Sequence, residues 1–176
     1  GTAQAQRTNT WTGGSGSAYW FGAQNWSASS PQDFDDLVFT GTTRLNHFSY
    51  ADLDATSPND FIINSITFDA AAGAFVISDG GGPVGSIIKL QGDITNSSAN
   101  LQTLNFNFQL NGGNRLVNTT AGDIAIGGII SEDSARTLSQ VGAGTLTLSN
   151  ANTHSSTQIG TTNGATAGTV LIKNNK

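Results

Sequence analysis

The stretch Ala143-Gly144-Thr145-Leu146-Thr147-Leu148 decides the fold, because it recurs 24 residues later as Ala167-Gly168-Thr169-Val170-Leu171-Ile172. Apolar and polar residues alternate in the first copy, as they do in a β-strand with one buried face. A shorter motif, Gly92-Asp93-Ile94, recurs 30 residues later as Gly122-Asp123-Ile124. Loose repeats of this length are typical of a solenoid, in which each coil supplies short strands to parallel sheets.

The same pattern extends over the chain from Phe61 onward as a series of short apolar segments separated by Gly, Asn, Ser and Asp. Their centres lie about every 20 residues, a period that favours a solenoid. Within one run, Leu104, Phe106, Phe108 and Leu110 are expected to face the core and the intervening amides to face solvent. A β-sandwich also has frequent short strands and remains the alternative, although it needs no repeated motif at this distance.

The composition supports an all-β chain and excludes several functions. Gly, Thr, Ser and Asn make up 79 of the 176 residues, and a single Glu (Glu132) with few Lys argues against helices. The net charge of −5 without a basic cluster argues against nucleic acid and anionic membranes as partners. The absence of Cys excludes disulfides and thiolate metal sites. No apolar run is long enough for a transmembrane helix, so no membrane insertion is expected.

Residues 1–60 differ from the rest, because they contain all three tryptophans and half of the acidic residues. We expect this region to be a β-rich cap that covers the strand edges at the start of the solenoid. Residues 61–176 are expected to form the coils, with Asn side chains stacked at the turns. The last strand is followed by Lys173-Asn174-Asn175-Lys176 without a cap-like change, so the natural protein is expected to continue beyond Lys176.

Two parts of the chain resemble a known family, the bacterial autotransporter-like passenger proteins. Trp11-Thr12-Gly13-Gly14, Asn25-Trp26-Ser27, Asp35-Asp36-Leu37-Val38-Phe39 and Asn64-Ser65-Ile66-Thr67-Phe68-Asp69 resemble their N-terminal part. The run from Gly142 to Thr153 resembles the autotransporter-associated β-strand repeat, but His154-Ser155-Ser156 stands where that repeat continues to a Tyr and a Gly pair. The resemblance implies a right-handed parallel β-helix, export to the surface of a Gram-negative-type cell, and no catalytic residues.

Acidic residues are the first candidates for a functional site, because some β-helix enzymes cleave polysaccharides with paired carboxylates. Asp33, Asp35 and Asp36 lie close in sequence and form a possible calcium loop, although no EF-hand pattern follows. The favoured interpretation is that the acidic residues cap turns. The remaining candidates are a second close pair, Asp52 and Asp54, and three acids at segment edges, Asp69, Asp93 and Asp123.

The other candidates are weaker. His47 and His154 lack metal-ligand spacing and are expected on the surface or in turns, although a Ser-His-Asp triad stays open. Exposed tryptophans would suit sugar stacking, but Trp11, Trp20 and Trp26 are expected to fill the core of the cap. The plausible basic partners for an acidic cluster in the coils are Lys89, Arg115 and Arg136.

These observations predict a non-catalytic structural or adhesive module that is secreted or displayed at the cell surface. It needs no cofactor and no metal, and its expected partners are further coils of the same chain, other copies of itself, or glycans of the cell surface or matrix. The alternative is a polysaccharide-active or carbohydrate-binding β-helix protein. A cluster of two or three acids with a basic residue in one outer groove would favour the enzyme.

Overall fold

The computed structural model describes residues 6–49, 60–80, 87–160 and 166–173, and these residues form a parallel β-solenoid. Apart from the 3-10 turn η1 (Ala23–Asn25), every regular element within these ranges is a strand, because alternating apolar residues separated by turn formers cannot build an amphipathic helix. The strands lie in two sheets, one of ten strands and one of six. The expected all-β fold is confirmed, and the β-sandwich alternative is wrong, because every strand ladder is parallel.

The ten-stranded sheet forms two sides of each coil. It contains β1 (Thr8–Trp11), β2 (Asp35–Phe39), β4 (Asp60–Phe68), β6 (Ile87–Leu90), β7 (Ile94–Asn96), β9 (Phe108–Leu110), β10 (Arg115–Asn118), β12 (Ile130–Glu132), β13 (Thr137–Val141) and β15 (Ser156–Ile159). The long strand β4 belongs to both sides, since its first half pairs with β6 and its second half with β7.

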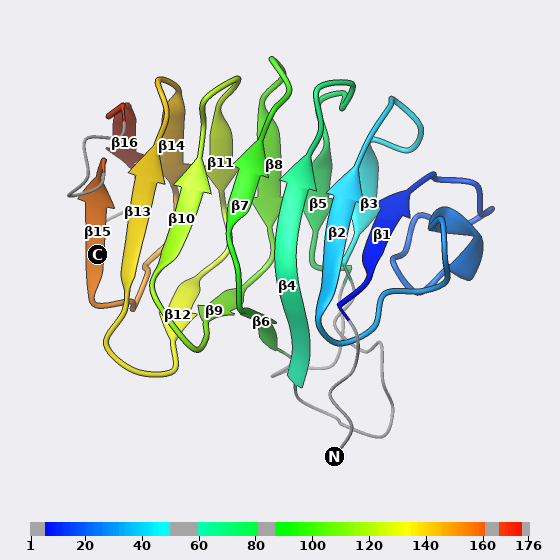
Figure 1. Cartoon of the computed structure of the whole chain (residues 1–176), viewed down its shortest axis with the longest axis horizontal. Coiled ribbons are helices and arrows are strands. Elements are labelled where there is room, and N and C mark those ends of the chain that lie inside the picture. The colour runs from blue at the N-terminus through cyan, green and yellow to red at the C-terminus, as the bar shows by residue number, and fades with distance from the viewer. Residues whose placement is uncertain (1–5, 50–59, 81–86, 161–165, 174–176) are drawn as a thin grey trace.

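The six-stranded sheet closes the coil on the opposite side. It contains β3 (Asn46–Phe48), β5 (Val76–Ser78), β8 (Gln102–Asn105), β11 (Ile124–Ile126), β14 (Thr145–Leu148) and β16 (Thr169–Ile172). In Figure 1 the chain rises along the strands at the front, crosses over the top, and descends along the strands at the rear. Successive coils advance from right to left in this view, and this direction combined with the upward front strands makes the winding right-handed.

The core is a set of side-chain columns that run along the solenoid axis. Leu104 stacks between Ile77 and Ile126, and every member of this column is buried. The 24-residue repeat is one coil, since Leu146 pairs with Val170 and the rest of the two copies follow in register. The four expected inward residues, Leu104, Phe106, Phe108 and Leu110, are all buried, although the chain turns a corner between β8 and β9 within that run.

The 30-residue repeat is not a coil. Ile94 pairs with Val117, whereas Ile124 pairs with Gln102 in the other sheet. The expected stacks of Asn are also absent from the described coils. Buried Asn96 pairs with Phe68, and its neighbour Thr95 pairs with Asn118. Buried Gln140 pairs with Val117 and Ile159. Gln140 interrupts an apolar column, and both amides donate hydrogen bonds to carbonyl oxygens of the turns beside them.

The N-terminal residues cover the first strand edges. Phe48 N–H donates to Ala18 O (2.8 Å) beside β3, and Thr12 N–H donates to Asn25 O (2.6 Å) beside β1. Parallel pairing already begins at β1 and β2, so the stacked sheets extend into the region expected as a separate cap. At the other end β15 and β16 are the last described strands of their sheets, and Ile159, Leu171 and Ile172 are about half exposed there.

Candidate functional site

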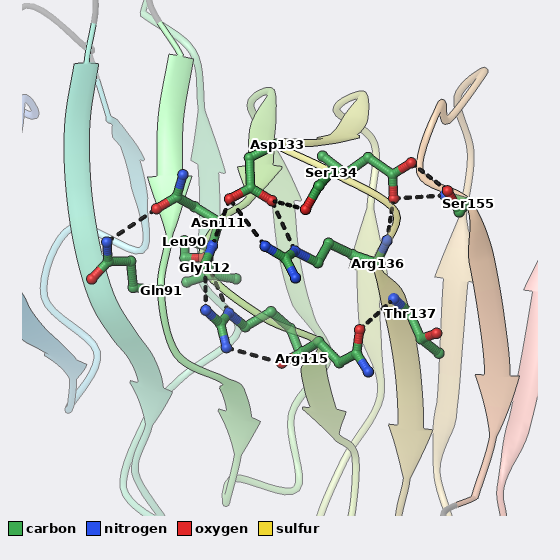
Figure 2. Close-up of polar contacts among 12 residues, drawn as sticks. Leu90, Gln91, Asn111, Gly112, Arg115, Asp133, Ser134, Arg136, Thr137 and Ser155 are labelled. Carbon is green, nitrogen blue, oxygen red and sulfur yellow. Dashed lines mark hydrogen bonds and ion pairs between the residues drawn. The ribbon is translucent and has the colours of Figure 1, made fainter.

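One charged cluster forms on the coils, at the turns before β10, β13 and β15 (Figure 2). Asp133 Oδ1 accepts a hydrogen bond from Arg136 Nε (2.8 Å), and its Oδ2 accepts one from the backbone N–H of Gly112 (2.8 Å). Glu132 Oε2 accepts the backbone N–H groups of Arg136 (2.7 Å) and Ser155 (2.8 Å). The Ser155 hydroxyl donates to Glu132 Oε1 at 2.5 Å. Two acids and a basic residue therefore do meet on the outside of the solenoid.

The electrostatics of this cluster favour a structural role. Hydrogen bonds from Ser155 lower the pKa of Glu132, and those from Arg136 and Gly112 lower the pKa of Asp133. A general acid for glycoside cleavage needs a raised pKa, so that it holds a proton at neutral pH. Both carboxylates instead stay ionised, and all their oxygens accept hydrogen bonds. The cluster joins three successive turns of the chain.

Arg115 also belongs to this cluster, where it binds backbone oxygens. Its guanidinium donates to the backbone oxygens of Leu90 (3.2 Å), Asn114 (2.9 Å) and Asn111. Partial burial lowers its pKa. Lys89, the other expected basic partner in this part of the chain, lies in β6 in register with Ile62 and Gln109. Among the expected basic partners, Arg136 forms an ion pair with Asp133 in this cluster.

Hydrogen bonds from a backbone N–H of one coil to an acidic side chain of the preceding coil also occur elsewhere. Asp93 Oδ1 accepts the N–H of Leu116 (2.8 Å), and Asp123 Oδ1 accepts the N–H of Thr145 (2.7 Å). Each acid thus caps the start of a strand in the following coil. Asn107 and Asn114 accept the N–H groups of Ile129 and Thr137 in the same way. The turn-capping interpretation therefore holds for Asp93 and Asp123, with the cap reaching across to the neighbouring coil.

The three N-terminal acids point to different partners. Asp35 forms a two-pronged ion pair with Arg7 (2.6 and 2.9 Å), and this contact raises the pKa of Arg7. Asp33 accepts the N–H of Ile62 (3.0 Å). Asp36 accepts the side chains of Gln6, Asn64 and Ser65. No calcium loop forms, and no group of three His, Asp or Glu suited to a metal occurs within the described residues.

The remaining acidic candidates add nothing to a site. Asp69 caps its own turn by accepting the N–H of Ala71 (2.9 Å). Asp52 and Asp54 lie outside the described residues.

His47 corrects the expectation of a surface or turn histidine, because it is buried in the aromatic core. Its ring stacks on Trp11 (4.2 Å between centroids) and on Phe39 (5.2 Å). Its Nδ1 accepts the indole N–H of Trp20 at 2.9 Å. Burial lowers the pKa of His47 to about 3, so the ring is neutral at physiological pH. A neutral imidazole packs here as a polar aromatic ring.

The three tryptophans are buried, as expected, and none is available to stack on a sugar. The indole N–H groups of Trp11 and Trp26 donate to Thr43 O (3.1 Å) and Trp20 O (2.7 Å). His154 is half-buried in a turn, where its Nε2 lies 2.7 Å from Thr157 Oγ1. No acid contacts His154 directly, and Ser155 is bound to Glu132, so the described residues assemble no Ser-His-Asp triad.

Two surface hollows occur among the described coils. One, of about 520 Å³, follows the corner turns and is lined largely by small residues such as Ala121, Gly122 and Ala143. The other, of about 300 Å³, lies beside β16 and is lined by Asn150, His154 and Ile172 among others. Asp133 and Arg136 line neither hollow, whereas Asp123 lines the first and Ser155, which binds Glu132, lines the second.

Sequence reasoning missed Glu132 and Asp133 as a pair. The signal was present, because the run from Glu132 to Arg136 is the densest group of charges in the coils. Within the described ranges no helix is long and apolar enough to cross a membrane. No protein-family model, curated protein or solved structure matches this chain.

Proposed function

We propose that this chain is a non-catalytic structural and adhesive module that acts outside the cell, as a stiff rod that presents its flat sides to other surfaces. One observation carries the proposal: four acids of the coils, Asp93, Asp123, Glu132 and Asp133, accept hydrogen bonds that join one coil to the next. Stacked coils with a continuous core resist bending, because each coil is held to the next by parallel ladders.

The resemblance to autotransporter-like passengers supports a secreted or surface-displayed protein from a Gram-negative-type cell. The proposed partners are further coils of the same kind, other copies, or glycans. The half-exposed Ile159, Leu171 and Ile172 at β15 and β16 offer apolar surface to a stacked coil. The neutral outer side chains of strands β3, β5, β8, β11 and β14 favour uncharged partners over nucleic acid.

The proposal is tested on intact cells of the source organism with an antibody raised against this chain. The expected result is strong labelling of intact cells and loss of the label after mild external protease treatment. Label that appears only after lysis would contradict the extracellular role. A deletion of the gene should reduce attachment of the cells to surfaces or to one another, and unchanged attachment would contradict the adhesive role.

The absence of catalysis is tested separately by incubating the purified chain with polysaccharides and measuring new reducing ends. We expect no product above that of a heat-denatured control. Product formation that the Asp133→Asn or Glu132→Gln variant abolishes would replace the structural role with the enzyme.

A further inference from the structure

Three aromatic side chains, Tyr19, Phe21 and Phe48, form a partly exposed group near the N-terminal end of the solenoid, which we call the aromatic platform. The Tyr19 ring stacks on Phe21 (5.1 Å between centroids, 22° between planes) and contacts Phe48 (5.2 Å). Phe21 and Phe48 keep 45% and 36% of their surface exposed. Such exposure stands out in a chain whose three tryptophans are all buried.

The backbone under the aromatic platform is firmly held. Trp20, between Tyr19 and Phe21, is fully buried and donates its indole N–H to His47. The Trp20 backbone N–H donates to Phe48 O at 3.0 Å, and Tyr19 forms a single parallel β-bridge with Phe48 of β3. Buried Asn25 donates to the carbonyl oxygens of Ser17 and Tyr19 (both 2.9 Å). Rings fixed in place before binding lose little entropy when a ligand arrives.

From this platform a neutral polar strip runs along the outer face of the six-stranded sheet, whose strands lie side by side at the rear of Figure 1. Phe48 is in register with Ser78, and Ser78 with Asn105. The strip is defined by the outward positions of β3, β5, β8, β11 and β14, none of which carries a charge: Asn46, Phe48, Val76, Ser78, Thr103, Asn105, Ala125, Thr145 and Thr147. Neighbouring strands stand about 4.8 Å apart, so the hydroxyl and amide groups lie close together, with Val76 and Ala125 between them in one column.

We propose that the aromatic platform and the neutral polar strip bind a neutral, linear polysaccharide. The C–H face of a pyranose ring packs on the electron-rich face of an aromatic ring, while its hydroxyl groups exchange hydrogen bonds with hydroxyl and amide side chains. A polyanion such as a uronate polymer or nucleic acid would find no cation on this strip. This inference rests on the proposed adhesive function and names the chemical class of its partner.

The test is affinity electrophoresis and titration calorimetry of the purified chain with soluble β-glucan, xylan, mannan and dextran, and with polygalacturonate and heparin as polyanions. We expect binding to at least one neutral polymer and none to the polyanions. The double variant Phe21→Ala/Phe48→Ala should weaken that binding at least about tenfold. Phe21→Tyr, which keeps the ring, should bind within a few-fold of the unchanged chain.

Leu101→Ala is the matched control, since Leu101 is apolar and 50% exposed but lies on a corner turn away from the platform. It should leave binding unchanged. Thr103→Lys, which places a charge on the strip while keeping both rings, should also weaken binding and guards against misfolding of the double variant. Tryptophan fluorescence reports whether each variant keeps the buried cluster of indoles.

Failure of the unchanged chain to bind any neutral polymer, or equal binding by the double variant, would overturn the inference. Binding to the polyanions alone would overturn it as well. In each case, continued labelling of intact cells would leave the extracellular role standing. Loss of that labelling with polysaccharide binding retained would instead contradict the proposed function.

Discussion

Acid should destabilise this protein mainly through His47. Its ring lies among Trp11, Trp20, Phe39 and Phe75, and burial lowers its pKa to about 3. An unfolded histidine has a pKa of about 6.5. Below that value the unfolded chain binds a proton that the folded chain does not, so folding stability falls as the pH drops from about 6.5 towards 3.

The size of the effect follows from that difference in pKa. Each unit of pH below 6.5 costs about 1.4 kcal/mol, which gives a loss of about 2.5 kcal/mol between neutral pH and about pH 4.5. Such a loss is a large part of the stability of an ordinary domain. Glu132 and Asp133 also have lowered pKa values, and their contribution is lost in acid too.

The His47→Gln variant separates these contributions, because a glutamine oxygen can still accept the indole N–H of Trp20 but does not titrate. Urea unfolding followed by tryptophan fluorescence at several pH values gives the free energy of unfolding for both proteins. The unchanged chain should lose about 2.5 kcal/mol more than the variant, since the carboxylates cancel in the difference. His154→Gln, the matched control, should keep the steep dependence. Parallel pH profiles for the unchanged chain and His47→Gln would refute the reasoning.

Three further predictions concern the coils, and denaturant unfolding measures each of them. Ile126→Ala removes a fully buried member of a core column and should cost about 2–5 kcal/mol, whereas Thr147→Ala on the outer face should cost less than about 1 kcal/mol; equal losses would contradict the inward register. Gly128→Ala would force a Cβ against the carbonyl oxygen of Phe106 and should cost about 1–3 kcal/mol, while Gly16→Ala, with open space around it, should stay within about 0.5 kcal/mol. Gln140→Leu suits the apolar column but removes the side-chain donor to the Gly142 carbonyl and the acceptor of the Gly168 N–H, so it should destabilise the chain by about 1–3 kcal/mol; a stabilised variant would show that packing outweighs these bonds.

The fold could be predicted because its strongest signal is local. Alternation from Leu104 to Leu110 reports which side of the chain is buried, and the 24-residue repeat reports the length of one coil. The corner between β8 and β9 gives no such signal, since Phe106 keeps the alternation while the backbone turns there. The alternation of apolar residues therefore predicts the length of a coil but not the positions of its corners.

The misleading 30-residue repeat has a physical reason. In the Gly-Asp-Ile motif the aspartate accepts an N–H from the start of a strand in the next coil. It appears before β7 and before β11, which lie in different sheets. A short motif can therefore recur because two turns need the same cap, without the two turns stacking on each other.

The site was harder to predict, because inward and outward positions of short strands depend on register. In Asn46-His47-Phe48, alternation allows either the imidazole or the phenyl ring to face the core. Pairing of His47 with Ile77 selects the imidazole and leaves Phe48 on the outer face. The exposed platform is a consequence of that choice, which only the neighbouring coil determines.

The two ends of the solenoid differ in a way that bears on assembly. At the N-terminal end the strand edges already have backbone partners, through the bonds from Thr12 N–H to Asn25 O and from Phe48 N–H to Ala18 O. A copy docking there by strand pairing must first break these bonds and expose the buried Trp26. At β15 and β16 a stacked coil would instead cover half-exposed Ile159 and Ile172. We therefore expect that another coil would pair more readily at the β15–β16 end, and that head-to-tail filaments of this chain would require the N-terminal cover to move.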